Sequence, residues 1–279
     1  TIYFLLSSTY ILAANWDGSG YNQNSTPQKV WFEKYEDSIP IRGDEDILDL
    51  GCGDGKLTSK ISKRLTTGSI LGLDRSKSMI DFANENFKDE NVKFRIGDMR
   101  SFKLKRKFDL IISFTALHWI REYDQVFKQV KEHLKPNGRI FFVLSTKFKY
   151  FPLDKALETM YAQDKWTNYF QNYDPGYYSH ELDPLMASLA NHGFEIKEMC
   201  LKNKVTIFET KEKMFLWLKT WFPQQNQVPP GLGDDFINEF IDKYSIFRTI
   251  NDDGIHWKGF LLKIEALYNP PMPQNLSKL

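Results

Sequence analysis

The sequence feature that most constrains this chain is the stretch Ile47–Gly55, which reads ILDLGCGDG. An apolar run of strand length passes directly into three closely spaced glycines, Gly51, Gly53 and Gly55. Glycines there let the backbone turn sharply and let a ligand approach with no Cβ in the way. Because ligands of open α/β sheets bind at the carboxyl ends of the strands, the stretch predicts a strand, a ligand-binding turn and a helix.

Apolar runs of strand length alternate with helical patterns through the first half of the chain. The pattern predicts strands at Asp46–Leu50, Ser69–Asp74, Val92–Ile96, Phe108–Phe114 and Arg139–Leu144, and helices at Leu57–Leu65, Ser76–Phe87 and Tyr123–Leu134. Such alternation indicates parallel strands joined by right-handed crossovers. The runs are apolar throughout rather than at every second residue, which is typical of a sheet that is covered on both faces.

The pattern changes after Ser145. Helical spacing there predicts helices at Leu153–Phe170, Asp183–Asn191, Glu209–Trp221 and Asp234–Tyr244. Two strand patterns lie in the same region, Phe194–Phe208, which is a strand or a hairpin, and Trp257–Leu267. We therefore predict an α/β fold with a mostly parallel seven-stranded sheet, in which the last strand is antiparallel, and with helical insertions that cover the ligand site.

The same patterns divide the chain into four parts. Residues 1–30 are predicted to form an N-terminal segment that covers the site, with a loop over the Gly- and Asn-rich stretch Asn15–Ser25. A helix is expected to begin at Pro27 and to run to about Ser38. Residues 31–150 are predicted to form the core, residues 151–268 a helical cap with the remaining strands, and residues 269–279 a Pro-rich tail.

Composition and charge argue against several kinds of partner. Lys and Arg number 37 and Asp and Glu 36, so the net charge of +1 gives no electrostatic reason to expect nucleic acid. Cys52 and Cys200 are too few for a disulfide scaffold, and no Cys and His residues have zinc-ligand spacing, so we expect no metal. The apolar stretch Thr1–Ala14 is too short to span a bilayer. Without a preceding basic residue it favours an extra helix or an over-extended start over a signal peptide. We expect a cytoplasmic monomer or homodimer that does not contact membranes.

Acidic residues end or follow three successive predicted strands, at Asp49, Asp74 and Asp98. The glycine spacing is G-x-G-x-G, with Lys56 in place of the third glycine of the dinucleotide fingerprint, which disfavours a nicotinamide cofactor. Asp49 can bind an ammonium group, which S-adenosylmethionine has and NAD lacks. Asp74 can accept from both ribose hydroxyls, and Asp98 from an adenine amino group with Met99 packed on the ring. Taken singly, Asp74 can also be a helix cap and Asp98 a turn residue.

These motifs resemble, in order, the motifs of class I S-adenosylmethionine-dependent methyltransferases, whose fold is Rossmann-like. The resemblance covers about Ile47–Ser145 and rests on ILDLGCGDG, the strand-ending Asp74, Gly97-Asp98, FDLIISF and LKPNGRIFF. It implies that Asp49 and Gly51–Gly55 hold the methionine part of the cofactor, Asp74 the ribose, and Asp98 with Met99 the adenine. It also implies further cofactor contacts from Tyr21, Cys52, Arg75 and Ser113. The product of the cofactor would be S-adenosylhomocysteine.

A looser resemblance concerns the methyl acceptor. The stretch Leu117-His118-Trp119 is similar to that of trans-aconitate and juvenile hormone acid methyltransferases, in which a Trp here faces the acceptor. Gln28 follows Tyr21 by seven residues, a spacing similar to that of the juvenile hormone enzymes, whose Gln helps hold the substrate carboxylate. The resemblance implies O-methylation of a carboxylate of a small molecule, with Gln28, His118 and Trp119 in the catalytic site. Without it, His118 can be a structural histidine, Trp119 a core residue and Gln28 a solvated helix residue.

A carboxylate acceptor fits a site that has no general base, because a carboxylate is already ionised at pH 7. Such an enzyme supplies alignment and the exclusion of water. The alternatives are methylation of an acid on an acyl carrier, methylation of a natural-product oxygen, an NAD-dependent oxidoreductase and a non-catalytic binding protein. No Asn-Pro-Pro-Tyr or Asn-Pro-Pro-Phe run follows the fourth predicted strand, which disfavours amide N-methylation.

Overall fold

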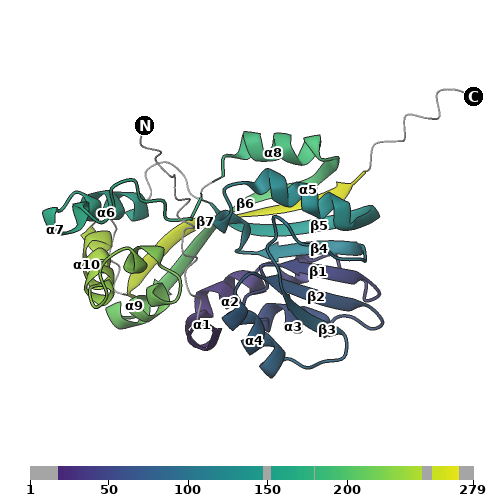
Figure 1. The fold of residues 1–279 in the computed structure, drawn as a ribbon, viewed down its shortest axis with the longest axis horizontal. Coiled ribbons are helices and arrows are strands. Elements are labelled where there is room, and N and C mark those ends of the chain that lie inside the picture. Colours follow the sequence, from purple (N-terminus) through teal and green to yellow (C-terminus); the bar gives the residue numbers. More distant parts are fainter. Residues whose placement is uncertain (1–17, 147–151, 179, 247–252, 270–279) are drawn as a thin grey trace, which may run out of the picture.

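The computed structural model describes residues 18–146, 152–178, 180–246 and 253–269, and its centre is a seven-stranded sheet (Figure 1). The strand order is β3-β2-β1-β4-β5-β7-β6. The strands are β1 (Asp46–Leu50), β2 (Ser69–Asp74), β3 (Val92–Ile96), β4 (Phe108–Phe114), β5 (Leu134–Thr146), β6 (Phe194–Phe208) and β7 (Ile255–Tyr268). Strands β1 to β5 are parallel, whereas β7 pairs antiparallel with both β5 and β6. The predicted fold class, including the antiparallel last strand, is confirmed.

Both faces of the sheet are covered, as the continuous apolar runs predicted. Successive residues of β1 enter different cores: Ile47 packs in one buried cluster and Leu48 in the other. Helices α3 (Lys56–Ser62) and α4 (Lys77–Asn86) contribute to the first cluster. Helices α5 (Tyr123–His133) and α8 (Leu182–Asn191) contribute to the second. Burial on both sides fixes the strand ends, and it therefore fixes the edge on which the glycine-rich turn stands.

Strands β6 and β7 extend beyond the rest of the sheet. The last pair between β5 and β7 joins Thr146 to Phe260, while β6 and β7 stay paired up to Phe208 and Ile255. Helices gather around this projecting two-stranded ribbon (Figure 1): α6 (Pro152–Tyr161), α7 (Asp164–Thr167), α9 (Lys211–Lys219) and α10 (Gly233–Ile246). We call these four helices the helical cap. The ribbon joins the cap to the sheet through continuous backbone.

Three helical expectations are corrected by the structure. The predicted loop at Asn15–Ser25 contains helix α1 (Gly18–Asn24), which packs against α4, so tertiary contact overrides the low helix propensity of its Gly and Asn residues. The single helix expected at Leu153–Phe170 is two helices, because Trp166 turns to pack edge-on against Phe236 of α10. The helix from Pro27 is α2 (Thr26–Glu33), and a separate 3-10 turn covers Glu36–Ser38.

Other boundaries differ by less. Residues 194–208 form one strand rather than a hairpin, and β5 begins at Leu134 rather than Arg139, across an irregular pairing with β4. The predicted segment Thr1–Ala14 and the tail from residue 270 lie outside the described residues. Within the residues that the structure describes, no helix has both the length and the apolar composition needed to cross a bilayer.

Candidate active site

The glycine-rich turn stands at the carboxyl end of β1, and its three glycines all have positive φ angles: +77° at Gly51, +55° at Gly53 and +80° at Gly55. At Gly51 an added Cβ would lie 2.3 Å from the Cβ of Ala116, so only glycine fits the close approach of these two loops. At Gly53 an added Cβ would meet no atom within 4 Å. The backbone of the turn is therefore packed from behind and open over Gly53, as a ligand cradle requires.

Asp74 ties the end of β2 to the glycine-rich turn. Its Oδ2 accepts a hydrogen bond from the backbone N–H of Gly53 at 3.0 Å, and its Oδ1 accepts from Ser76 at 2.8 Å. The cap of α4 is Ser76, whose side chain accepts from Met79, so Asp74 is not the helix cap that the sequence also allowed. Burial raises the pKa of Asp74. Each oxygen keeps a second lone pair, so the carboxylate can still accept from two hydroxyl groups.

Two more carboxylates are buried beside the turn. Asp49 is 3% exposed and accepts from the Thr58 hydroxyl at 2.6 Å, and burial raises its pKa to about 7. Asp54 accepts from the backbone N–H of Lys56 with one oxygen, while its Oδ2 is buried with no hydrogen-bond partner among the described residues. A buried carboxylate without a cation is unfavourable. An ammonium group placed here would stabilise the charged forms of both Asp49 and Asp54.

Tyr21 brings the N-terminal helices to the same place. It lies on α1, and the carboxylates of Asp54 and Asp74 add to burial in raising its pKa. This electrostatic effect requires the phenol to lie close to both acidic groups. The sequence resemblance placed Tyr21 at the cofactor, and the structure places it at the junction between the carboxylates and the neighbouring pocket that is described below.

The end of β3 carries the residues expected at the adenine. The carboxylate of Asp98 is held by the guanidinium of Arg100, at 2.6 Å from Nη2, and by the backbone N–H of the same residue. Although burial acts to raise it, these bonds lower the pKa of Asp98. Met99 lies over the turn, because its Cε is 3.2 Å from the position of a Cβ on Gly51. Arg75 is exposed just beyond β2. An adenine amino group would share Asp98 with Arg100.

Two residues expected at the cofactor have other partners here. The hydroxyl of Ser113 donates to the backbone carbonyl of Leu50 at 2.7 Å, which links β4 to β1 and leaves only its lone pairs for a ligand. The thiol of Cys52 is buried close to Gly72, and burial raises its pKa well above the usual value. Both side chains shape the floor of the turn. Within the described residues no three His, Cys, Asp or Glu side chains are arranged to hold a metal ion.

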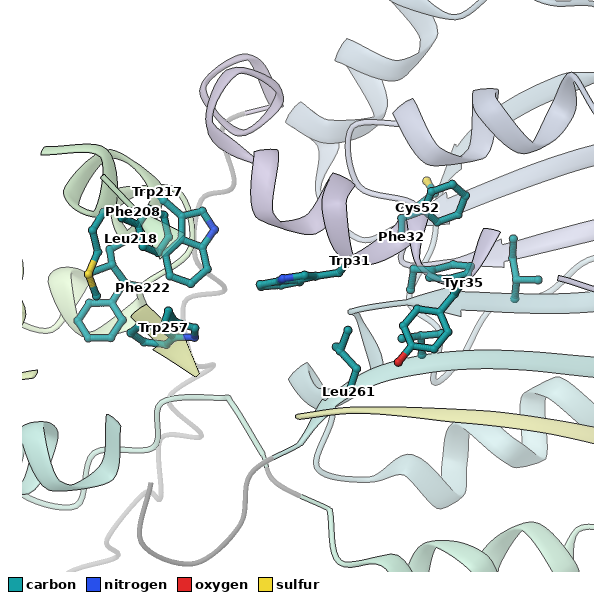
Figure 2. Close-up of a cluster of buried hydrophobic side chains, with 14 of the residues drawn as sticks. Trp31, Phe32, Tyr35, Cys52, Phe208, Trp217, Leu218, Phe222, Trp257 and Leu261 are labelled. Atoms are coloured by element: carbon teal, nitrogen blue, oxygen red, sulfur yellow. The ribbon is translucent and has the colours of Figure 1, made fainter. Parts of the chain in front are cut away.

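A pocket adjoins the strand-end carboxylates, between the sheet and the helical cap. It holds about 440 Å³ of empty space, its open mouth included, and it is lined by Tyr21, Gln28, Trp31, Thr115, His118, Trp119, Ser145, Tyr177, Lys204, Trp217, Trp221 and Trp257. Figure 2 shows Trp31 of α2 extending toward Trp217 and Trp257 of the cap side, away from Phe32 and Tyr35. We call this space the acceptor pocket. It brings together Gln28, His118 and Trp119, the three residues that the sequence assigned to catalysis.

His118 is held as a neutral ring with a defined tautomer. Its Nδ1 accepts from the backbone N–H of Ser145 at 3.2 Å, so the proton of a neutral ring lies on Nε2. Burial, with the nearby Lys204 and His180, lowers the pKa of His118 well below its usual value. His118 therefore serves as a structural anchor through one nitrogen and as a hydrogen-bond donor through the other.

Gln28 is oriented by a tryptophan of the cap. The indole N–H of Trp217 can only donate, and it lies 3.2 Å from the Gln28 side chain, so the amide oxygen faces Trp217. The amide NH₂ of Gln28 is the end that a ligand can use. Trp119 is half-buried, and its ring packs edge-on against both Tyr177 and Trp221 at centroid distances of 5.2 and 6.2 Å.

Sequence reasoning assigned no role of their own to several residues of this site, among them Asp54, Ser145, Lys204 and Trp221. Ser145 accepts from the Tyr177 hydroxyl and from the Lys204 ammonium, each at 2.8 Å. The indole nitrogen of Trp221 is buried with no hydrogen-bond partner among the described residues. Asp54 sits inside the glycine motif and could have been found there. The other three lie far apart in the sequence and carry no local motif.

One further feature of the pocket is backbone strain. Thr115 follows β4 and has a φ angle of +50°. Left-handed geometry is an outlier for a β-branched residue, and here it is fixed by a 2.7 Å hydrogen bond from the Thr115 N–H to the carbonyl of Val143. Such strain concentrates at functional sites, and Thr115 lines the acceptor pocket.

The fold and the strand-end site define a class of protein, the α/β enzymes that bind a nucleoside cofactor at a glycine-rich turn. Residues 41–204 match the model of a family described as a methyltransferase domain. The chain belongs to this methyltransferase family, and it is an S-adenosylmethionine-dependent methyltransferase. The oxidoreductase and non-catalytic alternatives are therefore set aside.

The chain is also similar to curated relatives and to solved structures. It is 25% identical to juvenile hormone acid O-methyltransferase of Drosophila melanogaster over 215 residues, which are 72% of this chain and 71% of that protein. It is 31% identical to trans-aconitate 2-methyltransferase of Deinococcus radiodurans over 123 residues, which are 44% of this chain and 46% of that protein. A structure described as that of a methyltransferase, BH2331 of Bacillus halodurans, has the same fold, with a TM-score of 0.60, 15% identity and coverage of 85% of this chain and 98% of that one.

Proposed function

We propose that this enzyme transfers the methyl group to a carboxylate oxygen of a small acid. The observation that carries the proposal is the polarity of the acceptor pocket: several of its lining side chains keep hydrogen-bond donors that have no partner among the described residues. Three such donors are available to a ligand: the amide NH₂ of Gln28, the Nε2–H of His118 and the indole N–H of Trp221. A carboxylate is acceptor-only, so it matches such a lining better than an amine does.

The reaction needs no residue that removes a proton, because a carboxylate at neutral pH has already lost its proton. When bound, S-adenosylmethionine supplies an electrophilic methyl group: a carboxylate oxygen forms the new C–O bond while the C–S bond breaks, leaving a neutral ester and a neutral thioether. His118 is a neutral ring that is protonated on Nε2, so it orients the acid rather than activating it. An acid is ionised at neutral pH, so no proton is transferred.

We also propose distinct roles for the residues around the acid. The amide of Gln28, fixed by Trp217, and the Trp119 ring hold the carboxylate at the end of β4, next to the glycine-rich turn. The aromatic walls exclude water, which would otherwise solvate the carboxylate and weaken it as a nucleophile. Asp49 and Asp54 would hold the ammonium group of the cofactor, Asp74 its ribose, and Met99 would pack on the adenine.

The parts of the chain that we propose as a cover enter the pocket from both sides. Helices α1 and α2 bring Tyr21 and Gln28, whereas α9 and the residues after it bring Trp217 and Trp221. Closure of these segments over the two ligands would complete the wall and shut out water. Added protection of residues 18–33 and 211–222 from hydrogen exchange, seen only with S-adenosylhomocysteine and an acid bound together, is the expected signature.

The test is the identity of the methylated product. The purified enzyme is incubated with methyl-labelled cofactor and with matched acceptors: dodecanoic acid, dodecanol, dodecylamine, phenylacetic acid, trans-aconitic acid and a malonyl thioester of acyl carrier protein. We expect label in base-labile methyl esters of free acids. Label in the amine or the alcohol alone would contradict the proposal, and label in the carrier-bound acid alone would move the acceptor to the acyl-carrier alternative.

A further inference from the structure

The acceptor pocket contains a buried lysine, Lys204 on β6, which the proposed function has not used. It pairs across the sheet with Gly259, one step beyond the last pair of β5 with β7, and its side chain lines the pocket. The residue is only 5% exposed. Its Nζ donates to the Ser145 hydroxyl at 2.8 Å and lies 4.0 Å from the ring centroid of Trp31.

Within the described part of the chain, no carboxylate balances this ammonium group. Among the residues that the structure describes, Lys204 forms no ion pair within 4.0 Å, although twenty-one other pairs of basic and acidic groups do so. Lysine is almost never fully buried without a partner, because the loss of water disfavours the charged form. This desolvation lowers the pKa of Lys204 to about 7.

The surroundings of Lys204 hold it in place without neutralising it. Ser145 accepts from Lys204 and from Tyr177, so the Ser145 hydroxyl proton is directed to a third position. The face of Trp31 is attractive to a cation and is itself fixed by a 3.1 Å bond from its indole N–H to Thr206. Two of the three N–H bonds of the ammonium group remain for other acceptors.

We propose that Lys204 is a substrate-binding residue that supplies the positive charge for the acceptor carboxylate, with Ser145 as the residue that positions it. This inference rests on the proposed function and narrows it. Among the described lining residues Lys204 carries the only ammonium or guanidinium group. One cation matches one carboxylate, so the pocket is suited to an acid with a single carboxylate and an apolar body against the tryptophans, and not to a tricarboxylate.

Other titratable groups around Lys204 do not provide the charge. His118 across the pocket stays neutral, because burial lowers its pKa well below the usual value. Burial, together with the negative charge of Asp154, raises the pKa of Tyr177 to about 12, so this phenol is neutral. On the same strand, Lys202 is exposed and lies over the ring of Tyr35. On β7, Lys258 pairs with Val205 and therefore belongs to the other face.

The test compares two substitutions that remove the charge with a matched control. Lys204→Met keeps the apolar stem and Lys204→Gln keeps a hydrogen-bond donor, while Lys202→Met removes an exposed lysine from the same strand. With saturating cofactor and dodecanoate as the probe, we expect both Lys204 variants to raise KM by roughly 10- to 150-fold with a smaller change in kcat. Lys202→Met should leave both constants unchanged. Binding of S-adenosylhomocysteine confirms that each variant is folded.

A second measurement uses the wild-type enzyme alone, so a folding defect in a variant cannot block the test. Calorimetric titration of dodecanoate into the enzyme with S-adenosylhomocysteine bound, at pH 8 in two buffers of different ionisation enthalpy, should show uptake of nearly one proton. The proton goes to Lys204, which is mostly neutral at this pH before the acid binds. Binding of the acid without proton uptake would overturn the inference.

The outcomes separate this inference from the proposed function. If the wild-type enzyme methylates no acid, the proposed function fails. If it methylates acids while KM is unchanged in both Lys204 variants, only the role of Lys204 fails. If kcat collapses and KM is constant, Lys204 acts as a base on the acceptor, and the charge-pairing role is wrong. If trans-aconitate is preferred to dodecanoate and phenylacetate, the single-carboxylate prediction is wrong.

Discussion

The two adjoining regions of the active site have opposite hydrogen-bonding character. At the strand ends the buried polar groups are acceptors, the carboxylates of Asp49, Asp54 and Asp74. In the acceptor pocket, which Thr115 after β4 and Lys204 on β6 help to line, the groups available to a ligand are donors, including those of Lys204 and Trp221. The difference matches what we propose that each region binds, because S-adenosylmethionine carries positive groups and an acid is an anion.

This opposition has a consequence for the rate of the reaction. Methyl transfer from a sulfonium to a carboxylate turns a cation and an anion into two neutral groups. The aromatic walls around Trp31, Trp119 and Trp257 offer little solvation, so they favour the step in which charge disappears. In our proposal the acceptors and donors of the two regions bind the charged reactants, and the apolar wall favours their conversion into neutral products.

The largest expected effect concerns the donors of the acceptor pocket. Gln28→Ala should lower the turnover of an acid by roughly 10- to 1,000-fold, because a positioned donor is lost. Trp119→Phe should lower it by a similar factor, because the smaller ring positions the acid less well. Binding of S-adenosylhomocysteine should be unchanged in both, since we assign neither residue to the cofactor. Steady-state kinetics beside calorimetric cofactor binding makes the comparison. If a variant loses cofactor binding while the bound complex turns over normally, the substituted residue belongs to the cofactor region, and our assignment to the acceptor pocket is wrong.

A smaller effect is expected in the cofactor region, where Gly53 has a matched control in Gly231, a glycine of the loop before α10. Gly53 and Gly231 both have positive φ angles and open space at the Cβ position. Substitution by alanine should therefore cost each protein a similar roughly 1–2 kcal/mol of folding stability. Only Gly53→Ala should also weaken S-adenosylhomocysteine, by roughly 5- to 150-fold, because its methyl group enters the ligand space. Equal cofactor affinity in the two variants would show that the ligand does not lie over Gly53.

The smallest effect is the dependence of acid binding on pH. The acid is ionised throughout pH 6 to 9, while Lys204, whose pKa burial lowers to about 7, loses its charge as the pH rises. With saturating cofactor, KM for the acid should be flat below pH 7 and should rise by up to about tenfold per pH unit above it. Burial also raises the pKa of Asp49 to about 7, but we assign Asp49 to the cofactor, which is saturating in this experiment. If KM does not change with pH, or if it rises equally in Lys204→Met, then Lys204 does not supply the charge that binds the acid.

The two regions also differ in how far the sequence predicts them. The cofactor region is contiguous: Asp49, Gly51 and Gly53 lie in one stretch, and Asp74 ends the next strand. Strand ends in a parallel sheet share one edge, so order along the chain becomes order in space. The bonds of Asp98 to Arg100 and of Ser113 to Leu50 depend on side-chain packing that no periodicity encodes.

The acceptor pocket was predicted only where a residue lies close to a recognisable motif. Gln28, His118 and Trp119 were found by resemblance, and the structure brings them together. Lys204 lies in a strand whose polar and apolar residues give no sign of which lysine is buried. Its burial follows from the long pairing of β6 with β7 beyond the end of β5 and from the position of Trp31, both of which are tertiary features.

The most direct test of the opposed polarities is the affinity of the acceptor pocket for a charged acid against its neutral ester. The wild-type enzyme, with S-adenosylhomocysteine bound, is titrated calorimetrically with dodecanoate and with phenylacetate, and then with the methyl ester of each. We expect at least one acid to bind, and to bind roughly tenfold or more tightly than its ester, because the ester loses the charge that the donors recognise. Equal binding of acid and ester, or tighter binding of the ester, would contradict a pocket built for a carboxylate.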